Sequence, residues 1–278
     1  MIYDFLVTHP VFSREDFVAY REAKGCSVHP AAIKKLLLHY CSSCVIVRLR
    51  QNLFAANITK AKQVYPNTYL IAASMTSDSV LAYHTAMMVR GESYSMLNRH
   101  YYLSLRHVRP FVYRNQAYQA LMPPKNLRKQ GLSFIETDTL MIHDKPVKVT
   151  SLERTLVDSL YSPDFAGGWE ELWRNFGRAA SLRWDALQAY VDLFDDKRLH
   201  AKLGFYLSMR QTQGLAVPDT VLTALALRSP KQASYIDIPE RFSPKQRWRF
   251  IKPWQLIVPE ELVNQSFEEA FQETDLAA

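Results

Sequence analysis

Residues 13–56 hold the pattern that most constrains how this chain can fold. A helical pattern opens at Ser13, where Asp16 stands three residues later in the spacing of a capping box. A second helical pattern covers residues 30–40, with a proline at its first position. Two strand-like runs follow over residues 45–56. Helix, turn, helix and β-ribbon in this order predict a winged helix-turn-helix, a module that commonly grips duplex DNA.

The second helix and the ribbon hold the candidate DNA-binding residues. Apolar residues of the helix follow the i, i+3, i+4, i+7 spacing of a buried stripe, which leaves polar groups on its other side. Lysines and arginines would bind phosphates, Arg50 could enter a minor groove, and His29 and Gln51 would contact bases. The full set of candidates is His29, Lys34, Lys35, Arg48, Arg50, Gln51 and Asn52.

Charge favours the same interpretation. Between residues 21 and 60 the only acid is Glu22, and the positive excess is more dilute elsewhere in the chain. The cations of this stretch are Arg21, Lys24, Lys34, Lys35, Arg48, Arg50 and Lys60. Concentrated positive charge on a small module is typical of phosphate binding. A module used only for protein contacts, with the lysines as a solvated face, is the alternative.

Length and composition predict a protein of two domains. The chain has 278 residues, a formal net charge of +7 and the composition of a globular protein. We expect a DNA-binding domain over residues 1–60 and a larger mixed domain over residues 66–278, giving an α+β fold. No apolar run approaches the roughly 20 residues of a membrane helix, and no secretory signal opens the sequence. With three cysteines in the chain, the cytoplasm is the expected location.

The sequence predicts no metal, cofactor or catalytic residue. Cys26, Cys41 and Cys44 match the usual zinc spacings poorly, and Cys26 and Cys41 are explained as small buried residues at helix ends. Motifs of metalloproteases, serine hydrolases and nucleotide-binding loops are absent from the sequence. The nearest set for a metal-dependent nuclease is Glu136, Asp138, Asp144 and Lys145, and turns explain its aspartates better.

The larger part predicts a small sheet and several helices. One helix is expected over residues 79–91, ending at a glycine, and another from a capping box at residues 150–153. On that second helix Arg154 and Asp158 have the i, i+4 spacing of an ion pair. Further helices are predicted over residues 168–177, 184–194 and 197–210. Short strands are predicted over residues 101–105, 110–114, 134–137, 140–143 and 147–149, with turns at Asp138-Thr139 and Asp144-Lys145. The aromatic and basic stretch over residues 230–259 is expected to pack its tryptophans against the body of the protein.

Three segments in a fixed order resemble the AbiEi-type antitoxins, the regulatory half of bacterial abortive-infection toxin–antitoxin pairs. The first is the basic ribbon over residues 47–55, and the second is the small-residue and histidine segment 79–84 followed by Gly91. The third and most specific is the run 149–158, followed by Gly167-Gly168. The longer helix pair near the N-terminus and the 230–259 stretch depart from the family's pattern.

The resemblance implies two activities and no enzyme. The N-terminal domain would bind inverted repeats in its own promoter and repress a toxin operon involved in phage defence. The larger domain would neutralise a cognate nucleotidyltransferase-like toxin without a stable complex between the two proteins. Glu153, Arg154 and Asp158 are the candidates for that second role, although a helix cap and an ion pair on one helix face also explain them.

Two other functions remain open at this point. One is a stand-alone transcriptional regulator whose second domain senses a ligand or forms oligomers. The other is a nucleic-acid-processing enzyme built on the same DNA-binding module.

Overall fold

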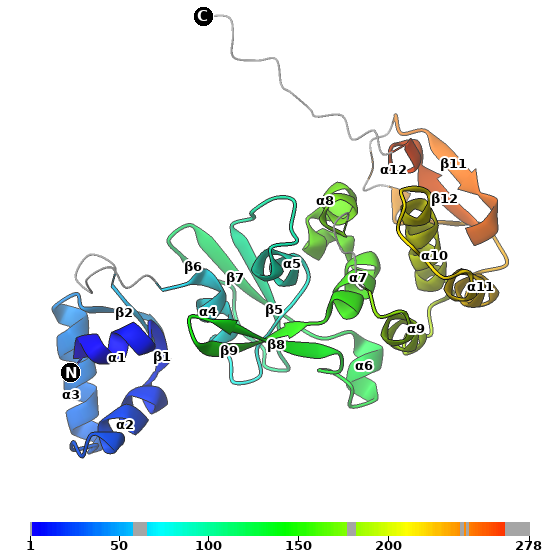
Figure 1. Ribbon diagram of the computed structural model, residues 1–278. Coiled ribbons are helices and arrows are strands. Elements are labelled where there is room, and N and C mark those ends of the chain that lie inside the picture. Colours follow the sequence, from blue (N-terminus) through cyan, green and yellow to red (C-terminus); the bar gives the residue numbers. More distant parts are fainter. Residues whose placement is uncertain (1, 58–65, 177–181, 240–241, 243–244, 265–278) are drawn as a thin grey trace, which may run out of the picture. The chain divides into compact units, whose positions relative to one another are not determined.

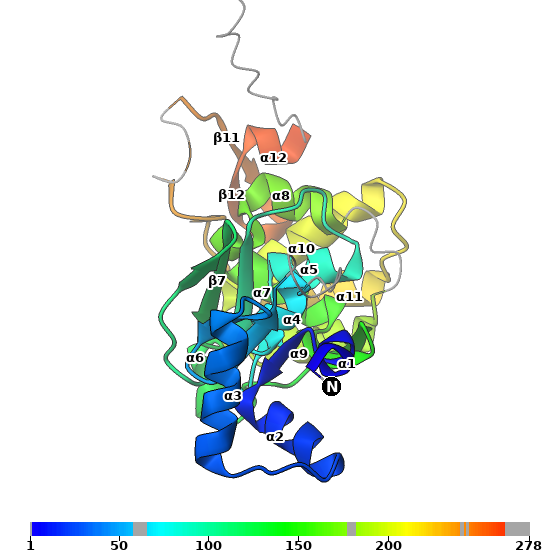
Figure 2. The same cartoon turned by 90° about the vertical axis from the view of Figure 1, so that its left-hand side faces the viewer.

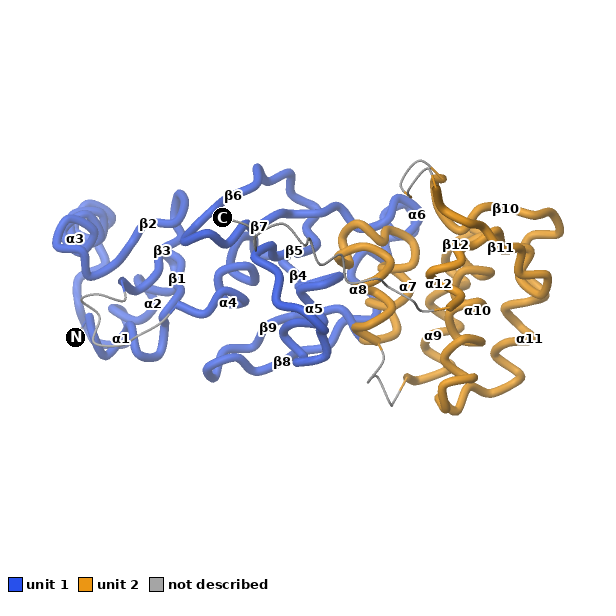
Figure 3. Tube along the Cα trace, turned by 90° about the horizontal axis from the view of Figure 1, so that it is seen from above, with its two compact units in different colours: residues 1–151 blue, residues 152–278 orange. Residues whose placement is uncertain are grey.

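The protein has an α+β fold of two compact units. The computed structural model describes residues 2–57, 66–176, 182–239, 242 and 245–264. Its units are Met1–Ser151 and Leu152–Ala278 (Figure 3). The predicted boundary near residues 60–66 falls mostly on residues 58–65, outside the described residues, and stays a prediction.

The first unit begins with what we call the amino-terminal module, residues 2–57. Its elements are α1 (Ile2–Thr8), β1 (Val11–Ser13), α2 (Arg14–Ala23), α3 (Pro30–Ser42), β2 (Ile46–Arg50) and β3 (Leu53–Ala56) (Figure 1). The three strands form an antiparallel sheet in the order β1-β3-β2. Helix, helix and hairpin follow one another as the sequence predicts, and α1 and β1 come in addition. Figure 2 shows α2 and α3 joined by an irregular segment at one end of the module.

Local sequence explains where these helices begin. The Ser13 hydroxyl accepts from the Asp16 N–H at 3.0 Å, and the Asp16 carboxylate accepts from the Ser13 N–H at 2.7 Å, so the predicted capping box is confirmed. The second helix begins at Pro30, as its pattern predicts. Beneath both helices lies a core built around aromatic and aliphatic side chains: Phe5, Phe12, Phe17, Ile33, Leu37, Ile46 and Phe54.

The rest of the first unit is a six-stranded mixed sheet with short helices. Its strand order is β6-β7-β5-β4-β9-β8. The strands are β4 (Val80–Leu81), β5 (Arg99–Leu103), β6 (Phe111–Tyr113), β7 (Gln116–Leu121), β8 (Thr137–Ile142) and β9 (Lys145–Thr150). The helices are α4 (Thr68–Ala73), α5 (His84–Arg90) and α6 (Lys125–Lys129). Helix α4 packs against β4, β5 and β9 in the middle of the sheet.

Several predictions for this sheet were wrong. The helix expected over residues 79–91 begins only at His84, because Leu81 lies in a strand that pairs with Tyr102 on one side and Val149 on the other. Its predicted end at Gly91, in the left-handed conformation, is confirmed. Asp138-Thr139 is no turn but part of β8, and no strand covers residues 134–136. Strand β7, which joins β5 to the edge strand β6, was not predicted at all.

The second unit is mainly helical. Its elements are α7 (Leu152–Tyr161), η1 (Pro163–Ala166), α8 (Gly168–Asn175), α9 (Trp184–Asp192), α10 (Lys197–Thr212), α11 (Asp219–Arg228), β10 (Ser234–Tyr235), β11 (Trp248–Ile251), η4 (Lys252–Trp254), β12 (Leu256–Pro259) and α12 (Glu260–Asn264). Helix α10 is buried along most of its length. Trp254 is 5% exposed and packs where Gly204 leaves room on α10, as expected of a tryptophan in the 230–259 stretch.

No helix among the described residues is both long enough and apolar enough to cross a membrane.

Candidate functional site

Helix α3 presents a cationic face on the amino-terminal module. Ile33 and Leu37 are buried on its inner side, whereas Lys34 and Lys35 are exposed. His39, one turn further on, is also exposed, and α3 contains no acidic residue. This face therefore offers cations without an internal counter-charge, as a helix that approaches phosphates requires.

Two side chains hold the start of α3, one from its capping residue and one from α2. His29 is the residue that caps α3, and its Nδ1 accepts from the N–H of Ala31 at 3.3 Å. Arg14 on α2 donates from its guanidinium to the carbonyl of Pro30 at 3.3 Å. His29 is exposed at this end of the helix, and its predicted contact with a base stays a prediction.

The apolar residues of the β2–β3 hairpin pack into two cores, one on each face. Ile46 and Phe54 belong to the core of the amino-terminal module, whereas Leu49 and Leu53 belong to a second core that includes Leu70 of α4. An irregularity in the pairing between Arg48 and Arg50 breaks the strict alternation that the sequence predicts. The sheet of the first unit thus supports the hairpin from one side, and the module's helices support it from the other.

The arginines of the hairpin have different surroundings. Arg48 is exposed, and its Nε donates to the carbonyl of Arg50 at 3.3 Å. Arg50 is half-buried and lines a cavity together with the turn residues Gln51 and Asn52. Asn52 adopts a φ of 66°, and its carbonyl accepts from the Arg14 N–H at 3.0 Å. Three of the seven candidates therefore gather at one cavity, while Lys34 and Lys35 lie on the exposed helix face.

The antitoxin candidates on α7 are buried. The Asp158 carboxylate accepts from Arg154 Nε at 3.1 Å and from the Tyr190 hydroxyl at 2.7 Å. The side chains of Arg154 and Asp158 are 0% and 1% exposed. The predicted i, i+4 pair is confirmed as an ion pair, but inside the second unit and not on a solvated face. Burial raises the pKa of the Asp158 carboxyl, against the opposing effects of Arg154 and Tyr190.

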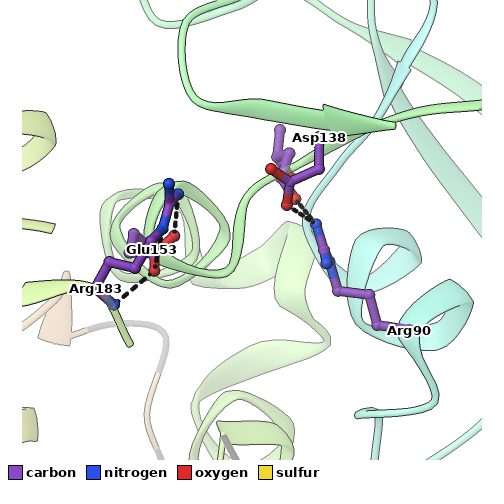
Figure 4. Close-up of polar contacts among 5 residues, drawn as sticks. Arg90, Asp138, Glu153 and Arg183 are labelled. Atoms are coloured by element: carbon purple, nitrogen blue, oxygen red, sulfur yellow. Dashed lines mark hydrogen bonds and ion pairs between the residues drawn. The ribbon is translucent and has the colours of Figure 1, made fainter. Parts of the chain in front are cut away.

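Glu153 on α7 fixes the start of α9 (Figure 4). Its carboxylate accepts from the Arg183 backbone N–H at 2.7 Å and from the Arg183 guanidinium at 2.9 and 3.2 Å. Desolvation of this carboxyl raises its pKa, but the hydrogen bonds from Arg183 outweigh that effect and hold the pKa below its ordinary value of 4.5. No local sequence pattern predicts this pair, because its members lie 30 residues apart.

A half-buried arginine, Arg90, pairs with the partly exposed Asp138 (Figure 4). Arg90 at the end of α5 donates to the Asp138 carboxylate at 2.6 Å and to the carbonyl of Thr150 at 2.9 Å. The Asp138 carboxylate, which belongs to the candidate nuclease set, thus ties β8 to α5, and the same arginine ties β9 to α5 through the Thr150 carbonyl.

No cluster suited to a metal ion occurs among the residues that the structure describes. Cys26 and Cys41 are partly buried, Cys44 is exposed, and none of these three cysteines is in a disulfide.

The comparisons with known proteins concern the fold alone. No model of a known protein family matches the sequence, and no curated protein matches it significantly. Among solved structures, the crystal structure of the RV2827C protein from Mycobacterium tuberculosis is similar, with a TM-score of 0.61 at 12% identity. The similarity covers 95% of this chain and 92% of that one. The fold of this chain, over nearly its whole length, therefore recurs in another protein.

Replacing Asp158 should destabilise the protein strongly. In Asp158→Asn the buried Arg154 guanidinium loses the negative charge of the Asp158 carboxylate, and breaking a buried pair costs about 3–5 kcal/mol. The free energy of unfolding in urea measures the loss. The double variant Arg154→Met/Asp158→Leu, which removes both charges, is the control and should recover most of it. A loss below about 1 kcal/mol, typical of exposed pairs, would contradict the buried geometry.

The stabilisation from Glu153 should depend on pH. Because folding lowers the pKa of this carboxyl, its contribution is complete above the ordinary value of 4.5 and is lost as the pH falls through the lower folded value. The difference in unfolding free energy between the native protein and Glu153→Gln, measured from neutral to acidic pH, should therefore shrink below that value. A difference that stays constant over the acidic range would show that the Arg183 contacts do not favour the ionised carboxylate.

Proposed function

We propose that the amino-terminal module is a winged helix-turn-helix that binds duplex DNA, and that the protein acts as a transcriptional repressor. The observation that carries the proposal is the exposed face of α3, which displays Lys34, Lys35 and His39 with no acid on the helix. In modules of this kind the second helix of the pair enters the major groove. The exposed Arg48 adds a cation on the adjoining hairpin.

Support for this orientation comes from how α3 is packed. Its apolar residues Ile33 and Leu37 are used by the module's core, so only its outer face is available to a partner. A helix of 13 residues spans about 20 Å, enough to present several side chains along a groove. The operator we propose is an inverted repeat in the protein's own promoter. The cytoplasm is the location that goes with this function.

We further propose that the protein is the antitoxin of a toxin–antitoxin operon and neutralises a nucleotidyltransferase-like toxin without a stable complex. This part rests on the resemblance of residues 47–55, 79–84 and 149–158 to AbiEi-type antitoxins. The run 149–158 lies at the start of the second unit, and most of it is buried. Burial of Glu153, Arg154 and Asp158 favours a structural role for them, with toxin contacts made by exposed residues.

A stand-alone regulator with a ligand-sensing domain is the second candidate function. The cavity beside Arg50 favours it, because a ligand bound there would touch the turn of the DNA-binding hairpin.

Loss of the helix-face lysines should weaken DNA binding at all sequences. For Lys34→Gln/Lys35→Gln we expect the slope of log affinity against log salt concentration to fall by about two units, one for each lost phosphate contact. Fluorescence anisotropy with a duplex from the region upstream of the gene measures this slope. Lys125→Gln/Lys129→Gln on α6, which removes the same charge from another exposed helix, is the matched control. Equal slopes for the two double variants would exclude α3 as the DNA-binding element.

Neutralisation should be separable from repression. We expect the product of the adjacent gene to arrest growth and this protein to restore growth when both are expressed from unrelated promoters. Lys34→Gln/Lys35→Gln should restore growth equally well, because its defect concerns DNA. A harmless neighbouring product, or arrest that persists with the full chain, would replace the antitoxin proposal with the stand-alone regulator.

A further inference from the structure

A cavity of about 970 Å³ lies beside the turn of the hairpin, within the first unit. One wall is formed by the beginning of α2 and by the turn residues Arg50, Gln51 and Asn52. Facing them are the segment 73–77, which follows α4, and the segment 106–108, which follows β5. Pockets for small molecules commonly measure about 300–1,000 Å³, so this one has room for a ligand of nucleotide size.

The walls of the cavity are fixed by contacts on both sides. Leu49 and Leu53, which flank the turn, are anchored in the core that the module shares with α4. On the facing side, the Asp78 carboxylate accepts from the Ser104 hydroxyl at 2.7 Å and from the Leu105 N–H at 2.8 Å. The segment that carries Arg106 is therefore held in place before any ligand arrives, which lowers the cost of binding.

Two arginines line the cavity from opposite walls, whereas both of its acids lie at the beginning of α2. These arginines are Arg50 and Arg106, with His107 beside the latter. Among the residues that the structure describes, neither guanidinium has an ion-pair or hydrogen-bond partner. The acids that line the cavity are Glu15 and Asp16, and one oxygen of Asp16 is already used by Ser13.

A buried hydroxyl adds to this set of unsatisfied groups. Tyr102 is fully buried, and its hydroxyl has no hydrogen-bond partner in the described part of the chain. Its ring stands in the same core as Leu49 and Leu53, and burial raises the pKa of its hydroxyl to about 12, with smaller effects of Arg50, which lowers the pKa, and of Asp78, which raises it. Buried polar groups are rarely left without a partner, and this one lies in the core behind the hairpin turn, not in the lining of the cavity.

We propose that this cavity binds a mononucleotide, with its phosphate between Arg50 and Arg106 and its base toward Glu15. The planar guanidinium is suited to bidentate contact with phosphate oxygens. A carboxylate accepts from the exocyclic amino groups of bases. The ligand therefore needs an anionic end and a donor-bearing end, which a mononucleotide has and inorganic phosphate lacks.

Binding at this place would also regulate DNA binding. This step rests on the proposed function. A nucleotide in the cavity would contact Arg50, Gln51 and Asn52, and would therefore compete with duplex DNA for the hairpin turn. Lys34 and Lys35 do not line the cavity, so the two sites can be tested independently.

The test is calorimetric titration of the full chain with AMP, CMP and GMP separately, and with inorganic phosphate. At least one nucleotide should bind at one site per chain, and inorganic phosphate should bind at least about tenfold more weakly. Arg50→Gln/Arg106→Gln should reduce nucleotide affinity about tenfold or more, since charge-assisted hydrogen bonds are lost. Glu15→Gln should change the preference among the three bases.

Two controls keep the outcomes distinct. Arg109→Gln/Lys129→Gln removes the same charge from exposed positions outside the cavity and should leave nucleotide affinity unchanged. Lys34→Gln/Lys35→Gln should bind the nucleotide normally even if it no longer binds DNA. Equal melting temperatures of the ligand-free variants show that their folds are intact.

Three results would overturn the proposal. They are the absence of saturable binding of any nucleotide, binding that Arg50→Gln/Arg106→Gln leaves unchanged, and inorganic phosphate binding as tightly as a nucleotide. If no nucleotide binds but Arg50→Gln/Arg106→Gln loses affinity for a duplex, the two arginines bind a phosphate of the DNA backbone, and the cavity is part of the DNA interface. Failure of DNA binding alone would overturn the proposed function and leave nucleotide binding standing.

Discussion

Strand β3 of the hairpin is buried on both faces, and the organisation of the first unit depends on this packing. Phe54 faces the helices of the amino-terminal module, while Leu53, its neighbour in the strand, faces the core that includes α4. Successive residues of a strand point to opposite faces, so four apolar residues in a row can serve two cores. The module and the sheet are thereby joined through apolar contacts that would be lost if the module were cut away.

This constraint bears on how DNA could be bound. Because β3 is covered on both faces, the hairpin can offer a partner only its edge strand β2, where Arg48 is exposed, and its turn, and α3 is left as the principal exposed cationic element of the module. The turn itself opens on a cavity whose far wall belongs to the sheet. The proposed functions of DNA binding and ligand binding therefore meet at the same three residues, Arg50, Gln51 and Asn52.

The charged residues of α7, unlike the exposed cations of α3, are buried. A capping glutamate and an arginine–aspartate pair are common on solvent-facing helices, where they contribute a few tenths of a kcal/mol each. Here Arg154 and Asp158 are buried with Tyr190, and a buried charge without its partner is costly. The pattern 149–158 thus has a structural explanation that holds whatever the protein does.

The local sequence by itself determined the beginnings and ends of many helices: the capping box at Ser13, the start of α3 at Pro30 and the stop of α5 at Gly91. These signals act within one helical turn, so no distant contact is needed to interpret them. Only the tertiary structure decided that Val80-Leu81 is a central strand, that Asp138 pairs with Arg90, and that Arg50 faces a cavity. Strand pairing, buried ion pairs and cavities join residues far apart in the chain, and no local pattern records which distant group will become the partner.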